Sequence, residues 1–89
     1  MSYIHSREYF SAGDIVVVEC NYQCNVMLMD DANFRSYRSG SRFTYYGGYY
    51  HLLPARIAVP CDGWWNVVLD LGGRSATIRY DFRVIKRAS

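Results

Sequence analysis

The sequence predicts an all-β protein, a two-sheet antiparallel β-sandwich of about seven to eight short strands. Two observations lead to this fold class. Apolar and polar residues alternate along the C-terminal third of the chain, which is the pattern of strands with one buried face. Turn signals recur about every eight to twelve residues, as they do in sandwiches and barrels.

Length and composition set the limits of this fold. A chain of 89 residues can bury one hydrophobic core and not two, so we expect a single β-sandwich domain over residues 1–89. The hydrophobic share of 51% exceeds that of a disordered segment. No apolar run suits a signal peptide or a membrane span, which predicts a cytoplasmic location. Three cysteines, an odd number, are interpreted as reduced thiols.

The C-terminal half carries the clearest strand pattern. Apolar residues occupy the odd positions over residues 64–71, and a second alternating run covers residues 76–84. Gly72-Gly73 between the two runs is typical of a two-residue hairpin turn, because glycine adopts positive φ without a steric penalty. We therefore expect the two runs to pair in one sheet. The expected cross-strand pairs are Trp65 with Tyr80, Val67 with Ile78 and Leu69 with Ala76.

Apolar segments bounded by turn signals predict further strands upstream. They cover residues 3–9, 15–20, 26–29 and 56–59. A three-residue loop at 61–63 would pair the last of these with the strand after it, and a connection that crosses between the sheets is the alternative. Tyr45–Tyr50, with Gly47-Gly48 at its centre, predicts a second hairpin or a longer loop. In that hairpin, Tyr46 lies opposite Tyr49.

Residues 31–38 form the one stretch without a β pattern. Asp30 is suited to cap a helix N-terminus, and Gly40 is suited to end the helix. Phe34 and Arg38 would share one face, four residues apart. We expect one short helical turn or two here, packed on the sheets, because eight residues do not hold a helix alone.

The most suggestive stretch for function runs from Phe34 to His51. It interleaves arginines with aromatic residues and contains no acidic residue. Guanidinium groups bind anions in a bidentate way, and exposed tyrosines are enriched in interfaces. The alternative is a sheet edge whose arginines are merely solvated. The candidate anchors of a ligand or partner are Arg35, Arg38, Arg42, Tyr46 and Tyr49.

No catalytic, metal or cofactor pattern stands clear of chance. A zinc site built from the three cysteines with His5 or His51 would lack a second closely spaced pair. Asp30-Asp31 could hold a cation, but we favour the interpretation of a helix cap followed by a first-turn charge, which explains the pair without a ligand. The glycine pairs do not have the spacing of phosphate-binding loops. We therefore expect no enzyme activity, no metal and no cofactor.

An ordered series of short motifs points to a family. The motifs are Asn25-Val26-Met27-Leu28-Met29-Asp30, Asn33-Phe34, Tyr37, Tyr45-Tyr46-Gly47-Gly48, Pro54-Ala55-Arg56-Ile57, Val59-Pro60 and Trp65-Asn66-Val67-Val68-Leu69-Asp70-Leu71-Gly72-Gly73. The series resembles the bacterial domain of unknown function 1883 family, over nearly the whole chain. The resemblance implies a β-sandwich that occurs alone or attached to a TIR domain, with no established activity.

These observations favour a non-catalytic binding or adaptor module linked to bacterial signalling or defence. Its expected partner is a protein or a small polar or anionic ligand. A formal net charge of +2 does not favour nucleic acid, and nothing indicates a membrane. Two alternatives are self-assembly into a homo-oligomer through an uncovered edge strand, and a small hydrolase that brings His51 close to a carboxylate.

Overall fold

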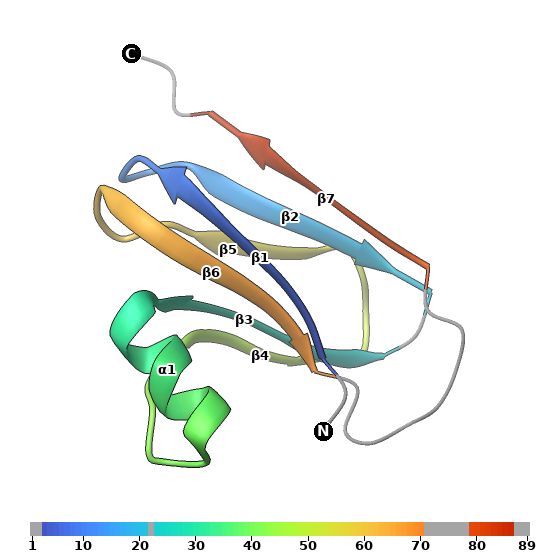
Figure 1. Ribbon diagram of the computed structural model, residues 1–89. Coiled ribbons are helices and arrows are strands. Elements are labelled where there is room, and N and C mark those ends of the chain that lie inside the picture. Colours follow the sequence, from blue (N-terminus) through green and yellow to red (C-terminus); the bar gives the residue numbers. More distant parts are fainter. Residues whose placement is uncertain (1–2, 22, 71–78, 87–89) are drawn as a thin grey trace.

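The computed structural model describes residues 3–21, 23–70 and 79–86, and within them it confirms the predicted fold class (Figure 1). The elements follow in the order β1 (Tyr3–Phe10), β2 (Ile15–Cys20), β3 (Cys24–Asp30), α1 (Asp31–Ser39), β4 (Tyr46–Tyr50), β5 (Ala55–Ala58), β6 (Gly63–Asp70) and β7 (Tyr80–Ile85). Strands β1, β6, β3 and β4 form a four-stranded sheet in that order, and β5, β2 and β7 form a three-stranded sheet. All strand pairs are antiparallel.

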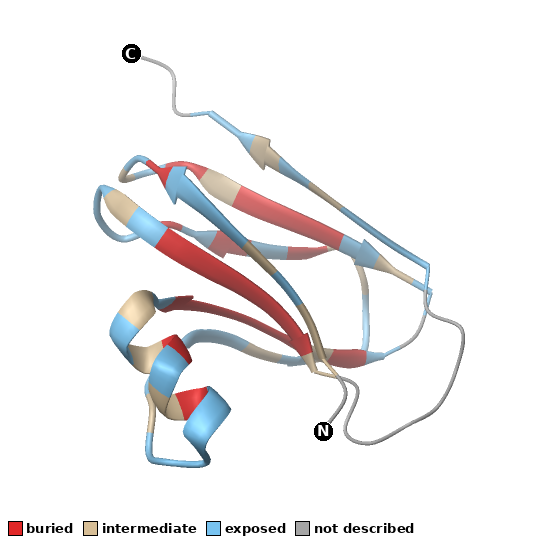
Figure 2. Cartoon of the chain, in the orientation of Figure 1, coloured by how far each residue is buried: buried red, intermediate tan, exposed pale blue. Residues whose placement is uncertain are grey.

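The main core lies between the two sheets. The three-stranded sheet contributes Val16, Val18 and Ile57, among others, and the four-stranded sheet contributes Val26, Leu28, Trp65, Val67 and Leu69. Trp65, Val67 and Leu69 are the odd positions that the alternation assigned to the apolar face, and all three are buried here. Figure 2 shows how the buried residues concentrate on β2, β3 and β6.

A second, smaller core lies between the four-stranded sheet and α1. It contains Met27 and Met29 from β3, Val68 from β6, and Phe34 and Tyr37 from the helix. β3 and β6 are therefore buried on both faces, which explains why residues 26–29 and 65–69 are all buried. No helix in the described part of the chain has both the length and the apolar character needed to cross a membrane.

The predicted C-terminal hairpin is wrong. β6 pairs with β1 and β3, whereas β7 pairs with β2 in the other sheet. Trp65 consequently lies opposite Glu8 and Asp30, and Tyr80 lies opposite Cys20. The glycine pair, Ala76 and Ile78 fall outside the described residues. Alternation fixes which face of a strand is buried but not its partner, and strands from opposite sheets of a sandwich face the same core.

The connection from β5 to β6 follows the alternative that crosses between the sheets. β5 pairs with β2, while β6 belongs to the four-stranded sheet. The crossing is held by backbone hydrogen bonds, in which the Gly13 N–H donates to the Val59 carbonyl at 2.9 Å and the Val59 N–H donates to the Asp14 carbonyl at 2.8 Å. These bonds anchor the start of the crossing to the turn between β1 and β2.

The predicted tyrosine hairpin is also wrong, because residues 46–50 form one strand, β4, at the edge of the four-stranded sheet. Gly47 lies opposite Met27 in this strand and has φ of +113°. A Cβ at Gly47 would collide with the Val26 carbonyl oxygen and lie 2.9 Å from Ile57 Cδ1. Glycine is therefore required for the close approach of β4 to β3, and not for a turn.

We expect Gly47→Ala to lower the free energy of unfolding by about 3 kcal/mol, because it combines a steric collision with a backbone conformation that alanine rarely adopts. Gly48→Ala is the matched control. Gly48 also has positive φ, but a Cβ there would meet nothing within 4 Å. Urea denaturation should show a loss of about 1 kcal/mol for the control. Equal losses in the two variants would contradict the close approach.

Candidate functional site

The two residues that the sequence predicts as helix caps, Asp30 and Gly40, flank helix α1. The Asp30 carboxylate accepts a hydrogen bond from the Asn33 N–H at 2.8 Å, which caps the first turn. Gly40 adopts the left-handed conformation, and the next N–H, of Ser41, donates to the Ser36 carbonyl at 2.9 Å. The capping interpretation of Asp30 is confirmed, and the helix extends one residue beyond the expected range.

The buried face of α1 fixes which residues point outward. Phe34 and Tyr37 pack on the four-stranded sheet. The Tyr37 hydroxyl donates to Asp70 Oδ2 at 2.5 Å, and burial together with this hydrogen bond raises the pKa of Tyr37 above its ordinary value. Arg35 and Arg38 therefore occupy the exposed side of the helix.

A buried amide joins α1 to the sheet. Asn66 on β6 is fully buried, and its Nδ2 donates to the Met29 carbonyl at 3.2 Å and to Asp31 Oδ1 at 2.9 Å. Both partners are acceptors only, so the orientation of the amide is fixed. Its Oδ1 lies 2.7 Å from His5 Nε2, which must carry the proton of this hydrogen bond. One side chain thus links β1, β3 and the first residue of α1.

Asp31 connects this network to an ion pair at the surface. Arg7 donates to Asp31 from Nε at 3.0 Å and from a terminal nitrogen at 2.8 Å, in a bidentate arrangement. The hydrogen bonds from Arg7 and from Asn66 lower the pKa of Asp31 from 3.8 to about 2. The carboxylate is therefore charged at neutral pH and already engaged, so it is not a vacant cation site.

Arg35 and Arg38 flank a shallow cleft on the outer side of α1. With Ser39 they line a volume of about 290 Å³. The Arg38 guanidinium lies 5.8 Å from the centre of the Phe34 ring, within the range of a cation–π contact. The structure thus brings two of the five predicted anchors together.

Arg42 lies on the segment that leads from α1 to β4. This segment runs back along the helix, because the Thr44 N–H donates to Asn33 Oδ1 at 2.8 Å and the Phe43 ring packs edge-on against Tyr37, 5.2 Å between centres. Arg42 is exposed on it. The third predicted arginine therefore belongs to the same outer layer as α1.

The two predicted tyrosines do not share a face. Tyr46 lies opposite Leu28, whose side chain belongs to the core between the sheets, and its ring packs edge-on against Trp65 at 6.0 Å. Tyr49 lies opposite Asn25, three residues along the strand and therefore on the other side of the sheet. The shared face that the hairpin would have given is absent in β4, although both rings are about half exposed.

An aromatic pair beside α1 escaped the sequence analysis. Tyr9 on β1 lies directly opposite Trp64 on β6, with ring centres 5.7 Å apart and exposed fractions of 52% and 50%. The Arg7 guanidinium lies 4.3 Å from the centre of the Trp64 ring. Trp64 occupies a polar-face position of its strand. A large aromatic residue at such a position was the one sequence signal that pointed to this pair. The incorrectly predicted pairing of β6 with β7 concealed its true neighbour, strand β1, which carries Tyr9.

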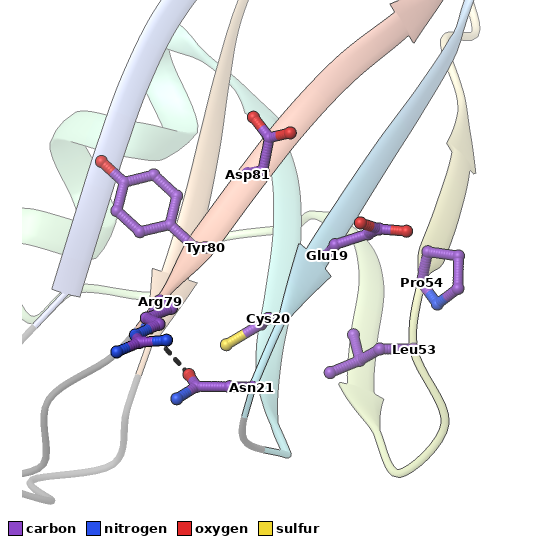
Figure 3. A pocket seen from close by; sticks show the side chains of 8 residues that line it. All are labelled: Glu19, Cys20, Asn21, Leu53, Pro54, Arg79, Tyr80 and Asp81. Atoms are coloured by element: carbon purple, nitrogen blue, oxygen red, sulfur yellow. Dashed lines mark hydrogen bonds between the residues drawn. The ribbon is translucent and has the colours of Figure 1, made fainter.

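The described lining of a larger cleft includes none of the three predicted arginines, Arg35, Arg38 and Arg42. The cleft has a volume of about 410 Å³, and its eight described lining residues come from the end of β2, the β4–β5 connection and the start of β7. Figure 3 shows Cys20 and Asn21 between the β7 residues on one side and Leu53 and Pro54 on the other. The described lining carries two carboxylates, Glu19 and Asp81, and one guanidinium group, Arg79, so its formal charge is negative. This cleft therefore does not have the basic character predicted for the site.

No disulfide bond joins any of the three cysteines in this structure. Cys20 and Cys24 lie with their sulfur atoms 3.8 Å apart, while Cys61 is exposed on the β5–β6 connection. Among the described residues, no three His, Cys, Asp or Glu side chains are grouped so that they could hold a metal ion. His51, the base that a hydrolase would need, lies edge-on against the Tyr49 ring at 4.8 Å.

Comparison with known protein families identifies a match for this chain. A family model described as a domain of unknown function (DUF1883) matches residues 1–88. No curated protein and no solved structure matches the chain.

The pKa of Asp31 gives a test of the site's electrostatics. Arg7→Gln should raise this pKa from about 2 toward 3.8, because it removes the hydrogen bond from the Arg7 guanidinium, which is the largest cause of the lowered pKa. Since the folded-state pKa is the lower one, the ion pair stabilises the fold fully above about pH 4 and ceases to do so as the pH falls toward 2. Carbon-13 titration of the Asp31 carboxyl measures the shift.

Arg35→Gln is the matched control for this titration. Arg35 acts on Asp31 only through a weaker, purely Coulombic effect. The pKa of Asp31 should therefore move much less in this variant than in Arg7→Gln. An equal response to the two substitutions would contradict the bidentate pair.

Proposed function

As a member of the family described as a domain of unknown function (DUF1883), the chain brings no assigned activity with it, and we propose that it is a non-catalytic binding or adaptor module. Its binding surface is the outer face of α1 with the adjoining segment to β4, and its partner is a protein segment that carries carboxylates. The observation that supports this proposal most directly is the exposed arginine pair of α1, Arg35 and Arg38, around one cleft.

Charge favours an anionic partner at this surface. Residues 32–61 contain Arg35, Arg38, Arg42 and Arg56 and no acidic residue. The nearest carboxylate of the helix, Asp31, is engaged by Arg7. Arginine binds carboxylates through two parallel hydrogen bonds, so a pair of guanidinium groups on one helix face recognises acidic side chains with defined geometry.

The aromatic residues near α1 extend the surface. Tyr9, Trp64 and Arg7 lie on the outer face of the same sheet, beside the N-terminus of the helix. Exposed tryptophan, tyrosine and arginine are the residue types that dominate the binding energy of protein interfaces. A peptide that reaches from the arginine cleft past the helix start would meet both features, which is why we favour a protein partner over a small anion.

We place the protein in the cytoplasm, where free thiols persist, and in bacterial signalling or defence, as the family resemblance and its TIR attachment suggest. An adaptor of this kind needs no catalytic group. It needs a rigid surface, and a capped helix held on a sheet provides one.

Charge reversal on α1 tests the proposal. The probe is a fluorescein-labelled peptide of alternating glutamate and tyrosine, and binding is measured by fluorescence anisotropy. We expect Arg35→Glu/Arg38→Glu to weaken binding by about tenfold or more, because it replaces two attractions by repulsions. Arg42→Glu alone should weaken binding by a smaller factor if this arginine adjoins the bound peptide.

The matched control is Arg56→Glu/Arg83→Glu, which changes the net charge equally on the exposed face of the other sheet. It should bind the peptide within about twofold of the wild type at physiological ionic strength, where exposed charges act over about 8 Å. Equal weakening by both double variants would mean that only net charge matters. That result, or no binding to the wild type, would overturn the proposed surface.

A further inference from the structure

Two cysteines meet where the sheets are joined. Cys20 is the last residue of β2 in the three-stranded sheet, and Cys24 is the first residue of β3 in the four-stranded sheet. Their sulfur atoms lie 3.8 Å apart, and the Cys24 thiol donates to the Cys20 sulfur. A disulfide bond requires about 2.05 Å, so the two sulfurs need to approach by less than 2 Å, about one side-chain rotation.

The backbone holds both cysteines in place. Cys20 lies opposite Tyr80 in the β2–β7 ladder, and the neighbouring Asn21 exchanges two hydrogen bonds with Arg79, at 3.1 and 2.8 Å. Cys24 lies opposite Tyr50 in the β3–β4 ladder. Because ordered strand ends carry both thiols, their proximity is a property of the fold and is retained while the strands remain paired.

The two thiols differ in access to solvent. Cys24 is 2% exposed and belongs to the core between the sheets, whereas Cys20 is half-buried and lines the 410 Å³ cleft (Figure 3). A small oxidant can therefore reach Cys20 and not Cys24. An accessible thiol backed by a second thiol at contact distance is the arrangement of an attacking and a resolving cysteine.

We propose that Cys20 and Cys24 form a redox site that low-molecular-weight disulfides, such as oxidised glutathione, convert to an intramolecular disulfide. In the first step the Cys20 thiolate attacks one sulfur of oxidised glutathione, forming a mixed disulfide and releasing one glutathione thiolate. In the second step the Cys24 thiolate attacks Cys20 Sγ and releases the second glutathione. Two protein thiols are oxidised, two glutathione molecules are formed, and the two thiol protons pass to the departing thiolates.

The disulfide would change the molecule at a defined place. It would covalently join the end of one sheet to the start of the other, and it would replace the free thiol in the wall of the cleft. The wall of this cleft would therefore differ between oxidising and reducing conditions. The cleft is distinct from the arginine cleft of α1. This inference does not depend on the proposed binding function.

Intact mass spectrometry tests the site. The parent protein is Cys61→Ala, because the exposed third thiol would carry its own glutathione adduct. After incubation with excess oxidised glutathione and an acid quench, the parent should be lighter by two hydrogen atoms, and peptide mapping should join Cys20 to Cys24. A glutathione adduct on Cys20 should disappear about tenfold faster, or more, than in Cys24→Ala/Cys61→Ala, since the resolving thiol is intramolecular.

Two further variants separate the steps. Cys20→Ala/Cys61→Ala should stay unmodified, because Cys24 is inaccessible. Cys24→Val/Cys61→Ala should keep its adduct as the alanine variant does, which guards against a cavity effect in the core. A persistent adduct on Cys20 of the parent, or no reaction of the parent at all, would overturn the proposal. The parent itself has no substitution in the core, so its result stands whether or not the core variants fold.

Discussion

The buried side-chain amide of Asn66 is the interaction on which the outer layer of the molecule depends. An amide buried without partners costs free energy, so it is retained in a core only where its hydrogen bonds are made. Here its two donors and its acceptor serve three different elements: the end of β3, the first residue of α1, and β1. Removing one such partner costs about 1–3 kcal/mol, which is enough to specify one docking position of the helix.

The docking position of α1 determines which side chains are exposed on the outer side of the four-stranded sheet. With Phe34 and Tyr37 facing the sheet, Arg35 is exposed on the outward side of the helix, and Arg38, four residues from Phe34, is exposed at the edge of the buried face. The helix also covers the outer face of β3 and β6, so these strands are buried on both faces, while the Tyr9 and Trp64 rings remain exposed near the start of the helix. The packing of the smaller core beneath α1 and the exposure of the arginines on the helix thus both follow from the hydrogen bonds of Asn66.

The sequence predicted the positions of the strands and of the helix better than it predicted which strands pair with one another. Strands β2 and β6 and the capped helix α1 follow from local patterns, namely a β-branched run, alternation, and an aspartate and a glycine at the helix ends. Pairing depends on contacts distant in sequence, such as β1 with β6, 61 residues apart at His5 and Asn66, and no local pattern encodes them. Gly47 shows the same limit: a glycine that signals a turn locally is needed here for the contact of two strands. For the site, the basic helix face was predictable, whereas Trp64 with Tyr9 required the register.

Native-state hydrogen exchange of the α1 amides in Asn66→Leu tests the central claim most directly. Leucine keeps the branching and the number of heavy atoms of asparagine and removes its hydrogen bonds, and Asn25→Leu on β3 is the control for the substitution type. If the amide holds the helix, α1 amides in Asn66→Leu exchange about tenfold faster or more, relative to β2 amides, than in the wild type and the control. Unchanged protection of α1 relative to β2 would show that apolar packing alone positions the helix, and would contradict the account.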